Sequence, residues 1–339
     1  MSWLALALTP GVGPVRLAQV RQLAGDEPPS QAIVAEALGP NLSRAYAQIL
    51  ARNEEARVRA AAAKSGAVIL GIWEPAYPEN LLNLPQPPTV LFLRGQLPTL
   101  ASSVAIVGTR KATGIGIAFA RRTASELAQA GFTVVSGLAL GIDAAAHQGA
   151  LAGGGRTLAV LGSGLDRIYP SSHRALAAQI DLASEFPFGT GPRPEFFPRR
   201  NRIVAALARA ILVVEAPEHS GALITAKTGL ELGREVLAVP GRPSDPNSQG
   251  CNALIRDGAQ LIQSAAEIIE LLGAHPKPAL VPDSAVYRAL CTLGEALPET
   301  LAATCGVSPP EVLAELAVLE LTGAVKLAPG GRYIALLGS

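Results

Sequence analysis

The sequence has little charge, few aromatic residues and few cysteines. Charged residues make up 16% of its 339 residues and aromatic residues 4%, whereas hydrophobic residues make up 49%. A chain this apolar can bury a large core, which excludes intrinsic disorder, and its length suggests two or three domains. The 28 Lys and Arg residues nearly balance the 27 Asp and Glu residues. The net charge of +1 therefore argues against a uniformly basic nucleic-acid-binding protein.

Features typical of export, membranes and metal sites are also scarce. The three cysteines form no Cys-x-x-Cys pair, which favours a reduced, cytoplasmic protein. The apolar first residues carry no basic segment and are interrupted at Pro10-Gly11, so we expect no signal peptide. No apolar run approaches the roughly 18 residues of a membrane helix, so we expect no membrane association. The four histidines are scattered, and we expect no metal site.

Residues 1–65 predict an N-terminal helical domain. Leu17, Val20 and Leu23 are spaced for one buried helix face. Residues 10–14 form a Gly-x-Gly turn that opens a helix, because glycine permits positive φ. In helix-hairpin-helix modules the amides of such a turn face a DNA phosphate. The signal is short and also fits a plain structural turn. A SAM-like or helix-hairpin-helix-like domain is expected, and whether it touches DNA stays open.

Residues 66–275 predict an α/β domain. Apolar runs rich in β-branched residues predict strands at 67–70, 90–93, 104–107, 132–135, 157–161, 211–214 and 236–239. Amphipathic segments predict helices near 115–130, 143–152, 172–180, 201–209, 221–233 and 250–257. Apolar strands with helices between them are typical of an extended Rossmann-like, doubly wound, mostly parallel sheet covered on both faces. Ligands of such folds bind at the carboxyl ends of the strands.

Residues 276–283 contain three prolines and predict a linker. Residues 284–339 then predict three helices, near 284–292, 298–304 and 309–321, and a hairpin, which is the plan of a winged-helix domain. Residues 280–339 hold three Lys or Arg against six Asp or Glu, and the third helix carries three carboxylates and no cation. Because a helix that reads DNA would be repelled by phosphate with this charge, we expect a protein-contact or regulatory domain whose role stays open.

Loops of unusual composition follow four of the predicted strands. The loop after Val107 is rich in glycine and contains Arg110 and Lys111, but it is not Gly-x-Gly-x-x-Gly and supports dinucleotide binding only weakly. Glycines and cations at a helix start predict an anion-binding nest. Several nests on one sheet edge suit a polyphosphate chain better than a single nucleotide. Asp143, in the next loop, is expected to cap the helix that follows it.

Residues 193–202 combine four arginines, one glutamate and two adjacent phenylalanines in a chain with 4% aromatic residues. Arginine for phosphate and an aromatic ring for a base are typical of a surface that binds single-stranded nucleic acid. We expect Phe196 to pack in the core and Phe197 to stack on a base. The alternative, in which both rings fill the core and the arginines cap a helix, stays open.

No catalytic set emerges from the sequence. Serines in the glycine-rich loops lack a local His–Asp partner, and His147 lies in an apolar helical segment, where a packed histidine is expected. Glu185 and Glu215 end strands near the site and are the only acid or base candidates. We therefore expect a binding protein and no enzyme.

Several segments, in the same order along the chain, resemble the DprA family (DNA-processing protein A, also called Smf). The resemblance is carried by 104–116, 136–147, 162–170, 197–203, 220–226, 239–241 and 250–252, with 77–81 and 88–92 upstream. It implies a protein of natural transformation and competence that binds single-stranded DNA, protects it and loads the RecA recombinase. It also implies a homodimer formed through the Rossmann-like domain, and no cofactor. The recombinase contact and the dimer contact are not apparent from the sequence.

The resemblance and the loop compositions together give the candidate residues for single-stranded DNA. They are Gly108, Arg110, Lys111, Thr113, Ser136, Gly137, Gly141, Phe197, Arg199, Arg200, Asn201, Arg202, Ser220, Gly221, Thr225, Lys227 and Asn252. Many relatives carry a lysine directly after Tyr-Pro, where this chain has Ser171, with Arg174 three residues later. A phosphate contact at this point is therefore absent or moved to Arg174.

Two other functions compete with this interpretation. A nucleotide phosphoribohydrolase of the lysine-decarboxylase-like group would share the alternating strands and loops, but residues 220–230 lack its Pro-Gly-Gly and its glutamate. A winged-helix transcription factor is disfavoured by the acidic third helix.

Overall fold

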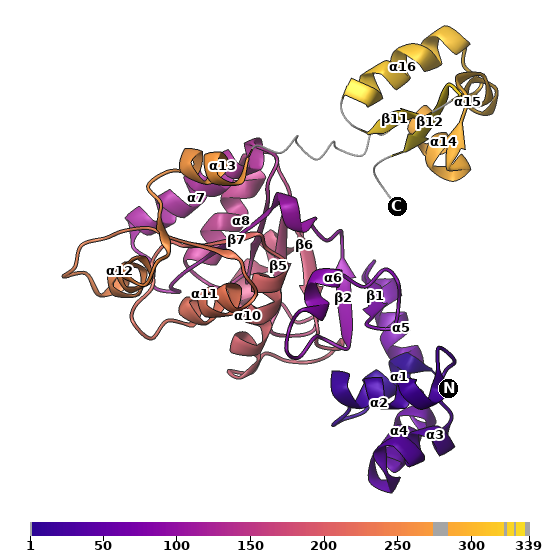
Figure 1. Cartoon of the computed structure of the whole chain (residues 1–339), viewed down its shortest axis with the longest axis horizontal. Helices are drawn as coiled ribbons and strands as arrows, with labels where there is room; N and C mark the ends of the chain where they lie inside the picture. Colours follow the sequence, from indigo (N-terminus) through magenta and orange to yellow (C-terminus); the bar gives the residue numbers. More distant parts are fainter. Residues whose placement is uncertain (1, 274–283, 322–323, 329, 336–339) are drawn as a thin grey trace. The chain divides into compact units, whose positions relative to one another are not determined.

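The computed structural model describes residues 2–273, 284–321, 324–328 and 330–335. The chain divides into two compact units, Met1–His275 and Pro276–Ser339, each with a hydrophobic core of its own (Figure 1). A further boundary at residue 65 within the first unit stays a prediction. The predicted linker, 276–283, lies outside the described residues.

Residues 2–65 are helical, as predicted. The helices are Trp3–Ala7 (α1), Pro14–Ala24 (α2), Gln31–Leu38 (α3), Pro40–Ala51 (α4) and Glu54–Lys64 (α5). Leu17 and Val20 are buried, but the prediction that Leu23 shares their face is wrong, because Leu23 is half exposed. At 3.6 residues per turn the buried stripe moves on to Ala24, which packs against the same cluster. Leu4 and Val58 belong to a cluster that includes residues of the sheet.

The sheet of the first unit has nine strands in the order β1-β2-β6-β5-β4-β3-β7-β8-β9. They are Val68–Gly71 (β1), Val90–Arg94 (β2), Ser103–Val107 (β3), Thr133–Ser136 (β4), Thr157–Val160 (β5), Asp181–Ser184 (β6), Ala210–Val213 (β7), Glu235–Ala238 (β8) and Gln260–Leu261 (β9). The pairs from β6 to β9 are parallel, whereas β1 pairs with β2, and β2 with β6, in antiparallel fashion. The mostly parallel, doubly wound fold is confirmed.

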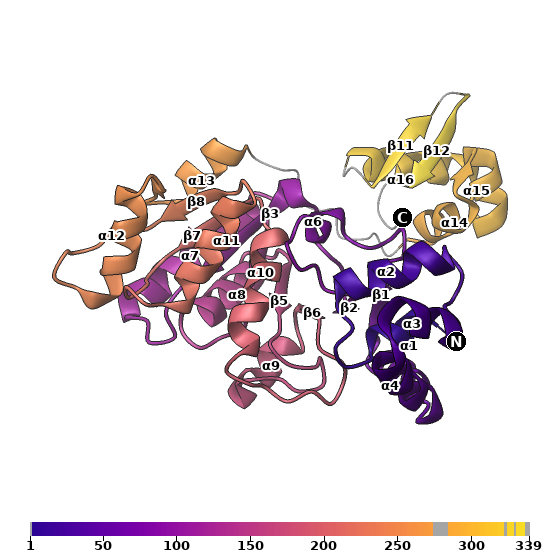
Figure 2. The same cartoon turned by 60° about the horizontal axis from the view of Figure 1, so that its bottom comes forward.

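Helices cover both faces of this sheet. They are Glu79–Leu82 (α6), Gly114–Gln129 (α7), Ile142–Ala152 (α8), Arg174–Ala177 (α9), Phe196–Ala206 (α10), Gly221–Glu231 (α11), Gln249–Arg256 (α12) and Ala265–Leu272 (α13), with 3-10 turns at Leu100–Ser102 (η1), Ser171–His173 (η2) and Pro246–Ser248 (η3). Side chains of β3 alternate between two clusters: Ala105 and Val107 pack with α10 and α11, and Val104 and Ile106 with α7 and α8. Figures 1 and 2 show α10 beside α11.

The structure adds elements that the sequence pattern did not predict. Strand β6 begins at Asp181 and has only four residues, and β9 has two. Neither is long enough to show a clear pattern of apolar and polar residues in the sequence. Helix α10 begins at Phe196, five residues earlier than predicted, because the Arg-rich segment is helical rather than loop. The predicted helix near 172–180 is only the short η2 and α9.

The second unit contains Ala285–Leu293 (α14), Pro298–Cys305 (α15) and Pro309–Leu321 (α16). A three-stranded antiparallel sheet follows the order β10-β12-β11, with strands Glu295–Ala296 (β10), Val325–Ala328 (β11) and Arg332–Ala335 (β12). Tyr287, Leu290 and Leu316 are fully buried in its core. The predicted three helices and hairpin are confirmed, and β10 is an addition.

No helix within the described ranges is long and apolar enough to cross a membrane by itself. Only Pro298–Cys305 and Pro309–Glu320 meet the length and composition criteria together, as a pair bent by 112°.

Candidate nucleic-acid interface

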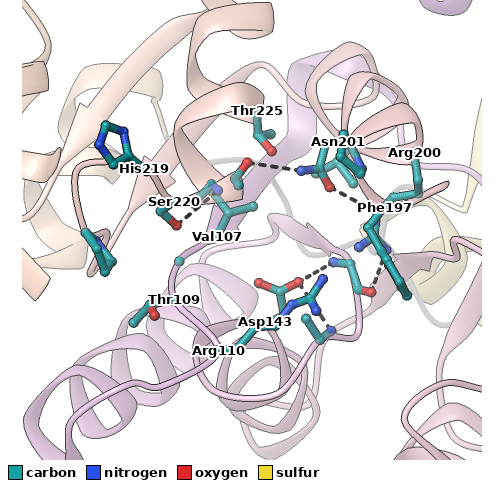
Figure 3. A pocket seen from close by; sticks show the side chains of 18 of the residues that line it. Val107, Thr109, Arg110, Asp143, Phe197, Arg200, Asn201, His219, Ser220 and Thr225 are labelled. Carbon is teal, nitrogen blue, oxygen red and sulfur yellow. Dashed lines mark hydrogen bonds between the residues drawn. The ribbon is translucent and has the colours of Figure 1, made fainter. Parts of the chain in front are cut away.

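A pocket of about 830 Å³ lies where the order of the strands reverses. Strand β3 pairs with β4 on one side and with β7 on the other, so the loops after β3 and β7 leave the sheet in opposite directions. Open α/β sheets bind ligands at such a switch point. The pocket is lined by residues 107–111, 192–194, 197–198, 200–201, 217–222 and by Gly137, Ala139, Asp143, Tyr169, Val204, Thr225 and Gln249 (Figure 3).

Two glycines let the loops after β3 and β4 approach each other. A Cβ on Gly108 would lie 2.6 Å from Ile142 Cγ1 and 2.8 Å from the Glu215 carbonyl oxygen. Gly141 has φ of +78°, and a Cβ there would lie 2.4 Å from the Thr109 carbonyl oxygen. Only glycine fits both positions, so the composition of these loops sets the shape of the pocket.

Three helices begin at this edge of the sheet. The Thr113 hydroxyl accepts a hydrogen bond from Gly116 N (3.0 Å) at the start of α7, and the Ser220 hydroxyl accepts one from Ala222 N (3.3 Å) at the start of α11. Gly141 caps α8 with no side-chain hydrogen bond. Helix N-termini carry partial positive charge and favour phosphate.

Three cations of the pocket are exposed. Arg110, Lys111 and Arg193 make no ion pair with another residue that the structure describes. The Arg110 guanidinium lies 4.8 Å from the centroid of the Phe197 ring, and that of Arg193 lies 5.4 Å from the Phe196 ring. Because their charge is not neutralised within the fold, these side chains can meet phosphate groups.

Arg200 and Asp143 form the buried floor of the pocket (Figure 3). The Asp143 carboxylate accepts hydrogen bonds from Gly137 N (3.1 Å) and Ala139 N (3.3 Å), while Arg200 Nη1 donates to the carbonyl oxygens of Gly137 and Val160. Burial lowers the pKa of Arg200 to about 10, and the charge of Asp143 opposes that shift. Arg200 stays protonated at neutral pH and holds the loop after β4 in place.

The prediction that Asp143 caps the following helix is wrong. Helix α8 already begins at Ile142, so Asp143 lies within the first turn and its carboxylate turns back to the preceding loop. Burial raises its pKa, and the nearby Arg200 charge and the two amide hydrogen bonds oppose that rise.

The two phenylalanines of α10 have different neighbours. Phe196 is half-buried and stacks on buried Phe186, with ring centroids 4.2 Å apart, so it packs against the core without being fully inside it. Phe197 lines the pocket and lies 5.6 Å from the Tyr169 ring. Tyr169 is not among the residues predicted for the site, although its place in a Tyr-Pro pair between two glycine-rich loops is a signal in the sequence.

Ten of the candidate residues line the pocket: Gly108, Arg110, Lys111, Gly137, Phe197, Arg200, Asn201, Ser220, Gly221 and Thr225. Thr113, Ser136, Gly141, Arg199, Arg202, Lys227 and Asn252 are not among the residues that line it. Other residues that line the pocket were not among the candidates, for example Thr109, Tyr169, Arg193, Glu218 and His219.

The residues outside the lining have other partners in the fold. Arg199 and Arg202 both donate to Glu185 Oε2, at 2.7 and 2.6 Å. The Ser136 hydroxyl donates to the Ile106 carbonyl oxygen at 2.6 Å. Asn252 exchanges two hydrogen bonds with the Gly241 backbone.

Lys227 is exposed on α11, beyond the residues that line the pocket. Ser171 and Arg174 are also exposed outside the lining. The pocket therefore gives no support to a phosphate contact at either position after Tyr-Pro.

The acid and base candidates are engaged in the fold. Glu185 accepts from two arginines, and Glu215 accepts from Thr113 N (2.9 Å) and from the Thr113 hydroxyl. His147 is buried, and its Nδ1 lies 2.7 Å from the Thr157 hydroxyl. Burial lowers the pKa of His147 to about 3, so it is a neutral, packed histidine, as predicted.

Comparison with known proteins agrees with this architecture. Residues 68–273 match the family of DNA recombination-mediator protein A, and residues 274–331 match the DprA winged helix domain. The chain is 47% identical over 212 residues to protein Smf of Synechocystis sp., an alignment that covers 60% of this chain and 53% of that protein. The chain thus spans about half the length of that relative.

Two solved structures share the fold. DNA processing protein A of Streptococcus pneumoniae aligns with a TM-score of 0.69 at 30% identity, over 80% of this chain and 98% of that chain. DNA processing protein A of Helicobacter pylori, solved for its single-stranded DNA binding mode, aligns with a TM-score of 0.56 at 29% identity, over 62% of this chain and 97% of that chain.

Proposed function

The chain belongs to the DprA (Smf) family of recombination-mediator proteins, and from this premise we propose that it binds single-stranded DNA in the pocket at the switch point. The observation that carries the proposal is the combination, in one pocket, of three exposed cations without a described ion pair, the start of α11 at Ser220–Ala222, and the rings of Tyr169 and Phe197. Cations and helix starts attract phosphate, whereas the rings offer a surface for unpaired bases.

Within this proposal the candidate residues take different roles. Arg110, Lys111 and Arg193 contact phosphates, because no described carboxylate pairs with them. Arg199 and Arg202 hold α10 against Glu185, and Arg200 holds the loop after β4. Three of the four arginines in the Arg-rich segment 193–202 therefore hold parts of the fold in place, and their charges are not available to phosphate.

We further propose that the protein protects incoming single-stranded DNA during natural transformation and loads RecA onto it, as a homodimer in the cytoplasm. Family membership supports the role and the dimer, and the three free cysteines fit a reducing compartment. Loading is tested by the rate at which RecA assembles on oligothymidylate with and without this protein, and faster assembly would support it. An unchanged rate of assembly at saturating protein would contradict it.

The winged-helix domain takes a protein-contact or regulatory role in this proposal. Helix α16 carries Glu311, Glu315 and Glu320 and no cation, so its approach to a duplex would meet phosphate repulsion. Arg332, one of three cations beyond residue 280, is already paired with Glu295 at 2.9 Å.

A binding role is proposed in preference to a phosphoribohydrolase. Such an enzyme needs an acid or base at the pocket. The two candidates from the sequence, Glu185 and Glu215, do not line the pocket and are bound to arginines and to Thr113 respectively. Of the acids and histidines that do line it, Asp143 is buried and accepts two backbone amides, whereas Glu218 and His219 are exposed. The decisive experiment titrates oligothymidylate and a duplex of equal length at several salt concentrations. We expect tighter binding of the single strand; equal affinity, or turnover of a nucleoside monophosphate, would contradict the proposal.

A further inference from the structure

Three planar groups lie in series at one side of the pocket. The Arg110 guanidinium is placed over the Phe197 ring, 4.8 Å from its centroid. The Tyr169 ring lies 5.6 Å from the Phe197 ring, with 42° between the two planes. A platform of this kind, next to unpaired cations, resembles the stacking surfaces that hold single-stranded nucleic acid.

The surroundings of the two rings differ. Phe197 is half-buried: the guanidinium of Arg110 lies over it, and Gly162 packs so closely that an added Cβ would lie 3.0 Å from Phe197 Cδ1. Tyr169 is 49% exposed, and its hydroxyl forms no hydrogen bond to another described residue. A base can therefore reach the Tyr169 ring without displacing any side chain, whereas access to Phe197 requires Arg110 to move.

A second and smaller hollow is lined by both rings. It is a hollow of about 50 Å³ whose lining adds Leu140 and Pro170 to residues of the main pocket. Tyr169 also lines the main pocket of about 830 Å³, so a base stacked on its exposed ring has Arg110, Lys111 and Arg193 in the same pocket for its phosphates.

We propose that Tyr169 is the residue on which an unpaired base stacks, and that Phe197 is a positioning residue that supports Tyr169 and Arg110. This inference rests on the proposed binding of single-stranded DNA. It makes Tyr169 a determinant of specificity for single strands, because a base in a duplex is already stacked on its neighbours and must leave them to reach the ring. Every base has a flat face, so the contact is independent of sequence.

The test uses the full chain and two oligomers of equal length, oligothymidylate and a fully abasic deoxyribose-phosphate chain. Tyr169→Leu removes the ring but keeps an apolar side chain over the hollow, and Tyr169→Phe keeps the ring. We expect Tyr169→Leu to weaken binding of oligothymidylate about 5- to 150-fold, the range for loss of one stacked base. Binding of the abasic chain should change less than about twofold, because that chain has no base to stack.

Two controls separate stacking from folding. Tyr169→Phe should bind oligothymidylate within about twofold of the unchanged chain, because the ring is what stacks. Leu230→Ala, an exposed position on α11 that does not line the pocket, should change neither affinity. Thermal unfolding of each variant shows that it is folded.

Either of two results would overturn the inference: Tyr169→Leu weakens both oligomers equally, or it weakens neither. Failure of the proposed function gives a different result. The chain without any substitution would then bind oligothymidylate no more tightly than a duplex of equal length.

Discussion

The dependence of DNA affinity on salt distinguishes free arginines from arginines that are already paired. The structure leaves Arg110, Lys111 and Arg193 exposed in the pocket, whereas Arg199 shares Glu185 with Arg202. The perturbation is Arg110→Gln, with Arg199→Gln as the matched control. Arg199 is a suitable control because its side chain is 56% exposed, yet its charge is paired at 2.7 Å.

The magnitude follows from counterion release. Each phosphate contact on a single strand contributes about −0.7 to the slope of log affinity against log salt, so three free cations give about −2. Between 50 and 200 mM salt, one contact is worth about 2.6-fold in affinity and three contacts about 20-fold. We expect Arg110→Gln to flatten the slope by about 0.7 and Arg199→Gln to leave it unchanged.

The assay is fluorescence anisotropy of labelled oligothymidylate at five or more salt concentrations. Removal of Arg199 leaves Glu185 paired with Arg202 at 2.6 Å, so the control should not expose a new buried charge. The reasoning is refuted if Arg199→Gln flattens the slope as much as Arg110→Gln does, or if Arg110→Gln leaves the slope unchanged.

Other predictions concern stability and domain roles. Arg200→Met leaves the carbonyl oxygens of Gly137 and Val160 without their hydrogen-bond donor. It should lower the free energy of unfolding, measured by denaturant titration, by about 3–5 kcal/mol. A loss below about 1 kcal/mol would contradict the role of Arg200. Burial lowers the pKa of His147 from 6.5 to about 3, so the unfolded state binds the extra proton and stability falls as pH drops below about 6.5. His147→Gln should remove up to about 2 kcal/mol of the loss between pH 6.5 and 5, and an identical pH profile would contradict this. Deletion of 276–339 should leave affinity for single strands within about twofold, because the pocket lies wholly in the first unit; a tenfold loss in a folded truncation would refute this.

The fold was largely predictable from the sequence because its strands are short apolar runs between amphipathic helices. The exceptions have physical reasons: β6 and β9 are too short for a periodic signal, and α10 begins within a segment whose arginines and prolines suggested a loop. The glycine-rich loops predicted the edge of the sheet where the pocket lies, since parallel strands place their carboxyl ends together.

The state of individual charges was not predictable. Sequence alone grouped Arg199, Arg200 and Arg202 with Arg110 as candidate DNA contacts. Their availability depends on Glu185, which follows β6, and on the carbonyls of Gly137, after β4, and Val160, at the end of β5. Only the tertiary fold brings these groups together. Tyr169 was missed for the same reason, because its neighbour Phe197 lies 28 positions along the chain.

The central claim, that single-stranded DNA lies in the pocket at the switch point, is tested most directly by mapping photocrosslinks. Oligothymidylate containing bromodeoxyuridine is irradiated with the full chain, and the crosslinked peptides are identified by mass spectrometry. We predict crosslinks in the segments around 108–111, 137–140, 169 and 192–201, with Tyr169 or Phe197 as the attached residue. Crosslinks confined to 2–65 or to 284–335, with none in these segments, would contradict the account.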